Sequence, residues 1–135
     1  MKEFVVDAKL DKLNDVLAFV DGWLEEHACS MKVQMQIDIA VEEIFVNIAN
    51  YAYVPKEGQA TIRLDETEDT PGVCITFIDR GVFYNPLAKP DPDVTLSASE
   101  RQIGGLGIFM VKKSMDSMLY EYTDEQNILT LIKHF

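Results

Sequence analysis

Hydrophobic residues recur along the chain with helical spacing in two long stretches. In the first, residues 11–28, they fall three or four positions apart with polar residues opposite, which predicts an amphipathic helix. A second helix is expected from Ser30, a favourable N-cap residue, to about Val54, because Pro55 cannot continue it. Shorter runs rich in β-branched and aromatic residues predict strands over residues 2–7, 59–67, 72–79, 117–123 and 127–135.

The order of these elements indicates one α+β domain over residues 1–135. A third helix is expected to open at residue 105, and the preceding stretch 86–99 carries three of the five prolines without a clear period. Such a long irregular stretch is typical of a functional lid or a disordered loop. The order β-α-α-β-β-lid-α-β-β predicts a two-layer α/β sandwich with a mainly antiparallel sheet and helices on one face.

Composition narrows the class of protein. A chain of 135 residues with 47% apolar residues can bury a proper core, and its net charge of −11 argues against binding to nucleic acid. It has no apolar run of 18 residues, and its opening MKEFVVDA is too short and acidic for a signal peptide, so we expect a soluble cytoplasmic protein without a membrane segment. Cys29 and Cys74 fit reduced thiols better than a disulfide framework.

Polar residues interrupt the second helix in one narrow stripe. At 100° per residue, Asn47 lies about 40° and Asn50 about −20° from Glu43 around the helix axis, with apolar residues on both sides. Glu42 and Asp38 fall on the expected solvent face. Buried carboxylates and amides need partners. The stripe is therefore either an internal hydrogen-bond network or the wall of a pocket for a polar ligand or a metal such as Mg²⁺, which prefers oxygen ligands.

Two further motifs allow a structural and a functional interpretation. Asp79 ends a strand two residues before Gly81, a spacing that is typical of a turn. Alternatively, Asp79 accepts a hydrogen bond from a base or sugar, and Gly81 lets the ligand approach the backbone. In QIGGLGIFMVKK, Gly104, Gly105 and Gly107 precede a helix, where free N–H groups form a phosphate site or the glycines form a hinge. The motif is neither a P-loop nor a Rossmann fingerprint.

Other catalytic centres have little support. His27 and His134 are the only histidines and lie far apart in the sequence, which disfavours a zinc site. The chain also has no nucleophile elbow around a serine.

Taken in order, the three motifs resemble the Bergerat ATP-binding fold of gyrase, histidine kinase and MutL ATPases. The chain has E-x-x-x-N on a helix, D-x-G after a strand, and G-G-x-G opening a later helix. A short single-domain chain with this arrangement is similar to anti-sigma factor serine/threonine kinases of the RsbW and SpoIIAB type. The similarity extends over nearly the whole chain, including the final LIKHF.

This resemblance implies roles for individual residues. Glu43 would orient or deprotonate the attacking group, and Asn47 would ligate the Mg²⁺ that bridges the phosphates of ATP. Asp79 would accept the amino hydrogen of adenine, with Gly81 beside it. The remaining nucleotide-binding positions that the resemblance implies are Asn50, Gly104, Gly105, Leu106 and Gly107.

The chain departs from the family pattern at three places. Tyr51 stands where many relatives have a histidine, in N-x-x-x-H-A-Y. The arginine that some relatives place just before the glycines has no clean match, since Arg101 lies slightly upstream. The usual Gly-Thr pair near the last strand is missing, which leaves Thr130 or Asn127 as its substitute.

The resemblance implies a kinase with two protein partners. It would phosphorylate a serine or threonine of an anti-sigma antagonist of the STAS type, sequester a sigma factor in its other state, and form a homodimer. Residues 84–103 would act as a lid that becomes protected when nucleotide binds. Two alternatives are a non-catalytic, nucleotide-dependent protein-binding switch and a free-standing ATPase.

Overall fold

The computed structural model describes residues 1–68, 70–88 and 105–135 of the chain. The expected lid, residues 84–103, lies mostly outside the described residues, so that prediction stays open. No helix within the described ranges is long and apolar enough to cross a bilayer. In chain order the elements are β1 (Lys2–Asp7), a 3₁₀ turn (Leu10–Lys12), α1 (Leu13–Glu26), α2 (Met31–Asn47), a π-helical turn (Ile48–Ala52), β2 (Gln59–Glu66), β3 (Gly72–Asp79), α3 (Gly105–Ser114), β4 (Ser117–Thr123) and β5 (Gln126–His134).

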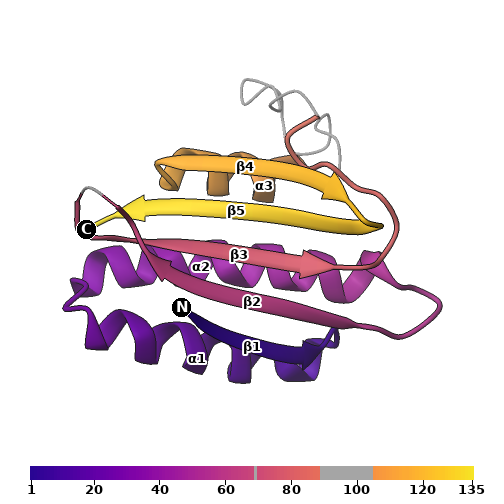
Figure 1. Cartoon of the computed structure of the whole chain (residues 1–135), viewed down its shortest axis with the longest axis horizontal. Coiled ribbons are helices and arrows are strands. Elements are labelled where there is room, and N and C mark those ends of the chain that lie inside the picture. Colours follow the sequence, from indigo (N-terminus) through magenta and orange to yellow (C-terminus); the bar gives the residue numbers. More distant parts are fainter. Residues whose placement is uncertain (69, 89–104) are drawn as a thin grey trace.

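The five strands form one antiparallel sheet in the order β1-β2-β3-β5-β4. The three helices lie behind one face of this sheet (Figure 1), and within their layer α2 contacts both α1 and α3. The predicted α+β sandwich with an antiparallel sheet is therefore confirmed. Because β3 and β5 are neighbours, Asp79 and Asn127 lie directly opposite each other.

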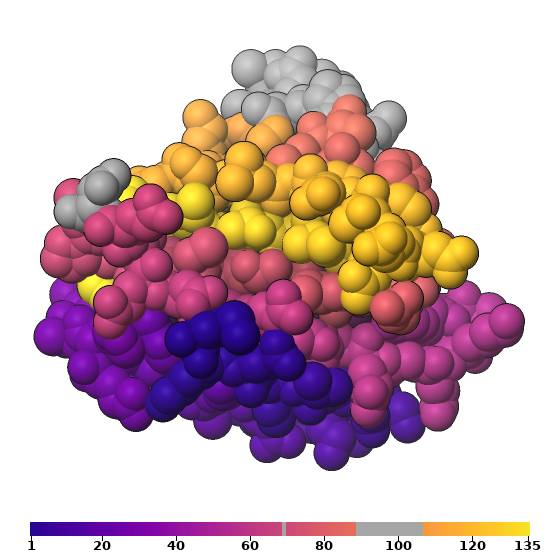
Figure 2. All heavy atoms as spheres, in the orientation of Figure 1, coloured from indigo at the N-terminus to yellow at the C-terminus, as the bar shows by residue number. Residues whose placement is uncertain are grey.

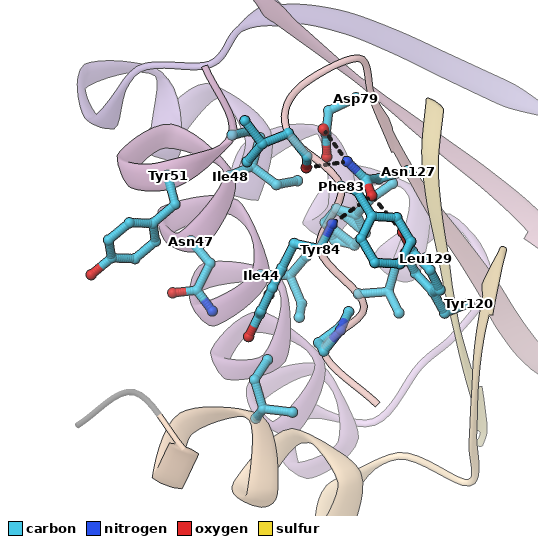
Figure 3. Close-up of a pocket in the computed structure, with 15 residues that line it drawn as sticks. Ile44, Asn47, Ile48, Tyr51, Asp79, Phe83, Tyr84, Tyr120, Asn127 and Leu129 are labelled. Atoms are coloured by element: carbon cyan, nitrogen blue, oxygen red, sulfur yellow. Dashed lines mark hydrogen bonds between the residues drawn. The ribbon is translucent and has the colours of Figure 1, made fainter. Parts of the chain in front are cut away.

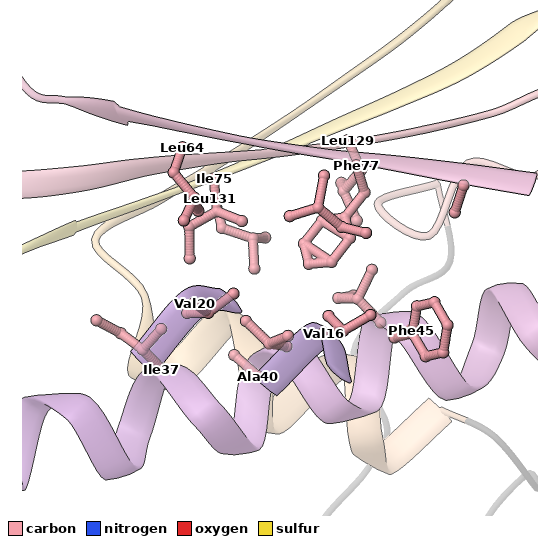
Figure 4. Packing of buried hydrophobic residues seen from close by; sticks show 14 of the residues in the cluster. Val16, Val20, Ile37, Ala40, Phe45, Leu64, Ile75, Phe77, Leu129 and Leu131 are labelled. Atoms are coloured by element: carbon pink, nitrogen blue, oxygen red, sulfur yellow. The ribbon is translucent and has the colours of Figure 1, made fainter. Parts of the chain in front are cut away.

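The core fills the space between the sheet and the helices (Figure 4). In β2 the inward residues Ala60, Ile62 and Leu64 are fully buried, whereas Thr61 and Arg63 between them are partly exposed. Successive side chains of a strand point to opposite faces, so each strand supplies one apolar row to the core. The helices contribute a matching set of fully or almost fully buried residues, Val16, Val20, Leu24, Ile37, Ala40, Val41 and Phe45.

The two ends of α2 are formed in different ways. Ser30 is its N-cap, as predicted, and its Oγ accepts a hydrogen bond of 3.3 Å from the Val33 N–H. At the other end, regular α-helix stops at Asn47 and a π turn continues to Ala52, two residues short of the expected end at Val54. In a π turn each residue advances by roughly 80° instead of 100°. Residues after Asn47 are therefore rotated from their predicted directions.

The prediction that Asp38 faces solvent is wrong, because α1 packs along that side of α2. Asp38 is half-buried beside Asp21 of α1, and the buried Oδ1 atom of each meets no hydrogen-bond partner among the described residues unless one of the two carboxyl groups carries a proton and donates to the other. Burial, followed by the hydrogen bond and the charge of Asp21, raises the pKa of Asp38 to about 8. The two carboxyl groups can satisfy each other only by sharing a proton.

The other face of the sheet is open to solvent (Figure 2). No described helix covers it, and strands from β1 to β4 lie side by side across it. Val5 on β1 and Leu119 on β4 are 50% and 58% exposed there. The molecule thus has one packed sheet face, which carries the core, and one open face.

Candidate functional site

A cavity of ≈ 450 Å³ lies at the end of the sheet where β3 finishes (Figure 3). Residues from α2, α3, β3, β4 and β5 line it, together with the segment that follows β3. Most of its wall is apolar or aromatic, and its polar side chains are few. Such concave, mostly apolar sites with a few placed polar groups are typical of small-molecule binding. The amide and carboxylate side chains among the lining residues are Asn47, Asp79 and Asn127.

Glu43 and Asn47 contact each other across one turn of α2. The Asn47 Nδ2 donates a hydrogen bond of 3.3 Å to the Glu43 Oε1, and both side chains are half-buried. Glu42 is exposed, as the helical register predicts. Because the amide nitrogen of Asn47 faces Glu43, its amide oxygen remains as the atom that can accept a hydrogen bond or ligate a cation.

The N-terminal turn of α3 reaches Glu43 through Gly107. A Cβ atom at Gly107 would lie 1.9 Å from the Glu43 Oε1, so no side chain fits there while Glu43 keeps its position. Gly105 and Leu106 belong to the same first turn of α3, and Gly104 lies outside the described residues. The glutamate motif and the glycine motif thus meet at the positive end of a helix.

Asp79 is a buried carboxylate with one oxygen occupied. Its side chain is 7% exposed, and its Oδ1 accepts hydrogen bonds from Gly81 N–H at 2.9 Å and from Asn127 Nδ2 at 3.0 Å. Burial raises the pKa of Asp79, whereas the bonds from Asn127 and Gly81 lower it. No described residue donates to Oδ2, which is therefore the free acceptor. The turn interpretation of this motif is confirmed, since the bond from Gly81 N–H closes the turn, whereas the role of Asp79 toward a ligand stays a prediction.

Gly81 allows the end of β3 to pack against the last turn of the α2 region. A Cβ atom there would lie 2.3 Å from the backbone oxygen of Ala52. The neighbouring Val82 N–H donates a hydrogen bond of 2.8 Å to the same oxygen. The structure thus gives Gly81 a packing role, in addition to the turn and the ligand approach that the sequence suggested at this point.

The π turn changes which residues face the cavity. Asn50 is exposed and does not line the cavity, so the prediction that it shares the stripe of Glu43 and Asn47 is wrong. Tyr51 lines the rim instead, with 68% of its side chain exposed. At roughly 80° per residue, the π turn rotates Asn50 out of the stripe and Tyr51 into it.

Asn127 completes the polar centre, and the sequence had left it as one of two candidates. It is 6% exposed beside Asp79, whereas Thr130 lies on the open face of β5, opposite Thr76 of β3. The structure separates them by the burial pattern of β5, where Leu129 and the residues two positions either side point inward. Asn127 is an even number of positions from Leu129, and Thr130 is not.

Tyr84 connects the two halves of the site. Its backbone N–H donates a hydrogen bond of 3.1 Å to the Asn127 Oδ1. Burial, followed by the negative charge of Glu43, raises the pKa of the Tyr84 phenol. The segment after β3 therefore lies along the cavity, whose wall includes Tyr84, Asn127 and Ile44 of α2 (Figure 3).

The site fits a magnesium ion only if a ligand supplies most of the oxygens. No group of three or more His, Cys, Asp or Glu side chains in the described ranges could hold a metal. Asn47 offers one amide oxygen at the cavity wall. Mg²⁺ is commonly held by one or two protein oxygens together with substrate phosphates and water, and this donor set matches that pattern.

Comparison with known proteins assigns most of the chain to one family. Residues 6–133 match the family model described as the histidine kinase-like ATPase domain. The chain is also 28% identical over 116 residues to the serine/threonine-protein kinase BtrW of Bordetella bronchiseptica, an alignment that covers 83% of this chain and 81% of the relative. The family match includes α2, β3, α3 and β5, which carry the polar centre of the cavity. The chain therefore belongs to the histidine kinase-like ATPase domain family.

Proposed function

We propose that this protein binds ATP together with Mg²⁺ and transfers the γ-phosphoryl group to a serine or threonine of a protein substrate. The observation that carries the proposal is that Asn47 and Asp79 line one cavity, while Glu43 contacts Asn47 and lies against Gly107 at the start of α3. Membership of the ATPase family implies ATP binding, and similarity to a serine/threonine-protein kinase supports the transfer reaction.

Asp79 would hold the adenine base. Its free Oδ2 is an acceptor in an apolar setting, which complements the amino group of adenine. Ile44, Ile48 and Leu129 line the same cavity and offer the flat apolar surroundings that a purine ring needs.

The first turn of α3 would bind the phosphates. The N–H groups that open a helix have no intrahelical partners, and the helix dipole adds partial positive charge there. Gly107 leaves that turn without a side chain at the point closest to Glu43. Asn47 would supply its amide oxygen to Mg²⁺, which when bound neutralises phosphate charge and orients the γ-phosphoryl group.

Glu43 would act on the attacking hydroxyl. As the hydroxyl oxygen bonds to the γ-phosphorus, the bond from that phosphorus to the bridging oxygen of ADP breaks, and the hydroxyl proton passes to the carboxylate. The hydrogen bond from Asn47 orients the Glu43 carboxylate, so the base is held in place before the substrate arrives.

We further propose an anti-sigma system for the protein partners. The substrate would be a STAS-type anti-sigma antagonist, and in its other state a homodimer of this protein would sequester a sigma factor. The motif order, which is similar to that of anti-sigma factor kinases, and the kinase relative support this proposal.

Tyr51 favours a second candidate function. It replaces the family histidine and stands exposed at the cavity rim, where a change of residue would alter phosphate handling without abolishing nucleotide binding. A protein of this kind would be a nucleotide-dependent binding switch without phosphoryl transfer.

Label transfer tests these functions with a matched pair of glutamates. The protein is incubated with γ-labelled ATP, Mg²⁺ and candidate antagonist proteins encoded by neighbouring genes. Glu43→Gln should bind ATP nearly normally but lose turnover by roughly 10²–10⁴-fold, because it keeps the shape and removes the base. Glu42→Gln, on the exposed side of the same helix, should change neither quantity.

The outcomes separate the candidates. Labelled antagonist supports the kinase, free labelled phosphate without labelled protein supports an ATPase, and ATP-dependent partner binding without turnover supports the switch. Loss of activity in Glu42→Gln with normal activity in Glu43→Gln would contradict the assignment of the base.

A further inference from the structure

Asn127 makes every hydrogen bond that its amide group can make. Its Nδ2 donates to the Asp79 Oδ1 at 3.0 Å and to the Val82 backbone oxygen at 2.9 Å. Its Oδ1 accepts from the Tyr84 backbone N–H at 3.1 Å and from the Tyr120 hydroxyl. A side-chain amide has two N–H donors and two oxygen lone pairs, so no group is left for a ligand.

These partners also fix the direction of the amide. The Val82 oxygen can only accept and the Tyr84 N–H can only donate. A flipped amide would face two acceptors, the Val82 oxygen and the Asp79 carboxylate, with its oxygen, and the Tyr84 N–H with its NH₂. It would lose those three bonds and could keep only the one to the Tyr120 hydroxyl, which can also accept. The Nδ2 of Asn127 is therefore held toward Asp79, and the carboxylate of Asp79 keeps its Oδ1 turned to β5.

A carboxylate held by one oxygen presents the other in a fixed place. Asp79 Oδ1 is taken by Asn127 and Gly81, and Oδ2 has no donor among the described residues. In this arrangement Oδ2 accepts an N–H from a bound base but repels a carbonyl oxygen. An amino purine is accepted at that point, and an oxo purine is not.

We propose that Asn127 is a positioning residue for base selection: through Asp79, it sets the preference of the site for purines that carry a 6-amino group. The inference rests on the proposed function, because it takes the cavity as the nucleotide site. It assigns the selectivity to Asn127 of β5, and not to Thr130, the other residue that could replace the missing threonine of the family.

A structural role and a positioning role predict different binding data. Asn127 also ties Val82 and Tyr84 to β5, so its removal could loosen the segment after β3. That loosening would weaken every purine nucleotide alike. Loss of the Asp79 orientation would instead remove the advantage of a base with a 6-amino group over the same base without one. The ratio of the two affinities is therefore the readout.

Calorimetric titrations of ATP, GTP and the 6-unsubstituted purine nucleoside triphosphate measure this ratio. In the wild type, one hydrogen bond to a charged acceptor should favour ATP over the 6-unsubstituted analogue by roughly 10–100-fold. Asn127→Ala should reduce this preference to about threefold or less, and should narrow the gap between ATP and GTP. Asn127→Thr, with a single hydroxyl donor, should restore part of the preference.

Three further variants serve as controls. Tyr120→Phe removes a donor to the Asn127 oxygen but leaves both N–H donors, so it should lower the preference less than Asn127→Ala. Thr130→Ala changes the open face of the same strand and should leave the preference unchanged. Asp79→Asn should already lack the preference, and adding Asn127→Ala to it should cause no further loss of selectivity.

The result that overturns the inference is parallel weakening. If Asn127→Ala binds all three nucleotides less tightly but keeps the wild-type ratio of their affinities, Asn127 only braces the segment after β3. Where the alanine variant does not fold, the same result in both Asn127→Thr and Tyr120→Phe leads to the same conclusion. The proposed function would stand in that case. If the wild type itself binds none of the three nucleotides, the proposed function fails and this inference fails with it.

Discussion

Gly81 and Gly107 both exclude a side chain, but the atoms that exclude it differ. A Cβ at Gly81 would meet the backbone of Ala52 at 2.3 Å, whereas a Cβ at Gly107 would meet the carboxylate of Glu43 at 1.9 Å. A backbone cannot move without disturbing the helix end, while the end of a glutamate side chain can rotate away. The two glycines therefore predict opposite defects.

Gly81→Ala should destabilise the fold by about 1–3 kcal/mol, in the range measured for overpacked sites. Gly107→Ala should keep stability within about 1 kcal/mol of the wild type but lower phosphoryl transfer, because it displaces the base. Urea unfolding and the label-transfer assay measure the two effects separately. Equal losses of stability in both variants would show that Glu43 is as immobile as the backbone.

Asp79 should make ATP binding dependent on pH. Burial raises its pKa, and the protonated carboxyl group is a poorer acceptor for the amino group of a base. Affinity should thus be full above that pKa and fall as the pH drops through it. Tyr53 and Tyr120 are the other titratable groups whose pKa values respond to Asp79; both are raised above 10.0 and stay neutral at acidic pH.

Calorimetry between about pH 5 and pH 8 checks this dependence. Asp79→Asn should bind ATP weakly and show only the pH dependence that the phosphates of ATP contribute. Subtracting its profile from that of the wild type isolates the carboxylate. Identical profiles in the two proteins would remove Asp79 from the base site.

At the scale of elements, α1 and α2 meet through the carboxyl groups of Asp21 and Asp38. The pKa of Asp38 is raised from 3.8 to about 8, mainly by burial. A group whose pKa is raised by folding contributes its full stabilisation when the pH is below its pKa in the unfolded chain. That contribution is lost as the pH rises through its pKa in the folded protein. The contact between these helices should therefore weaken between about pH 4 and pH 8.

Asp38→Asn should flatten that part of the stability curve. The amide cannot ionise, so the variant should be more stable than the wild type at pH 8, and the difference should shrink toward pH 4. Urea midpoints at several pH values measure it. Glu25→Gln, an exposed carboxylate later on α1, should leave the wild-type slope in place. A constant difference between Asp38→Asn and the wild type at every pH would contradict the shared proton.

Elements were predictable from sequence where their pattern is local. Ser30 caps α2 as expected, and the alternation in β2 and β5 follows the pleat of a strand. The π turn was not predictable, because a helical wheel assumes a rotation of 100° at every residue. The wheel therefore gave Asn50 the wrong direction. The partner of Asp38 lies on another helix, and a wheel drawn for one helix contains no information about its neighbours.

The site itself was predictable to the extent that its motifs are short and ordered. Asn47 and Asp79 line one cavity, and Glu43 contacts Asn47 and lies against Gly107, although 64 positions separate Glu43 from Gly107. The sequence could not choose between Asn127 and Thr130, because that choice depends on which face of β5 meets the core. Pairing of β5 with β3 decides it, and pairing is a property of the whole sheet.

At the scale of the whole molecule, the site draws on both layers of the sandwich. Glu43, Asn47 and Gly107 belong to the helix layer, while Asp79 and Asn127 belong to the sheet. The cavity walls are therefore held by the same packing that forms the core, and α2 contributes to both sides of the site, through Asn47 on one side and Ile44 and Ile48 on the other.

The net charge of −11 makes opposite predictions for two kinds of association. Two copies of this chain repel each other, so the proposed homodimer, if its contact is apolar, should tighten as salt screens the charge. A basic protein partner is attracted, so its association should slow as salt is added. The Debye length falls from about 30 Å at 0.01 M salt to about 3 Å at 1 M salt, so this range of salt reveals both effects.

Sedimentation velocity measures the association of the homodimer, and stopped-flow mixing measures the rate at which the basic partner binds. A homodimer that dissociates as salt rises would be held by ion pairs between copies, and an association rate that salt leaves unchanged would show that the acidic surface does not guide the partner.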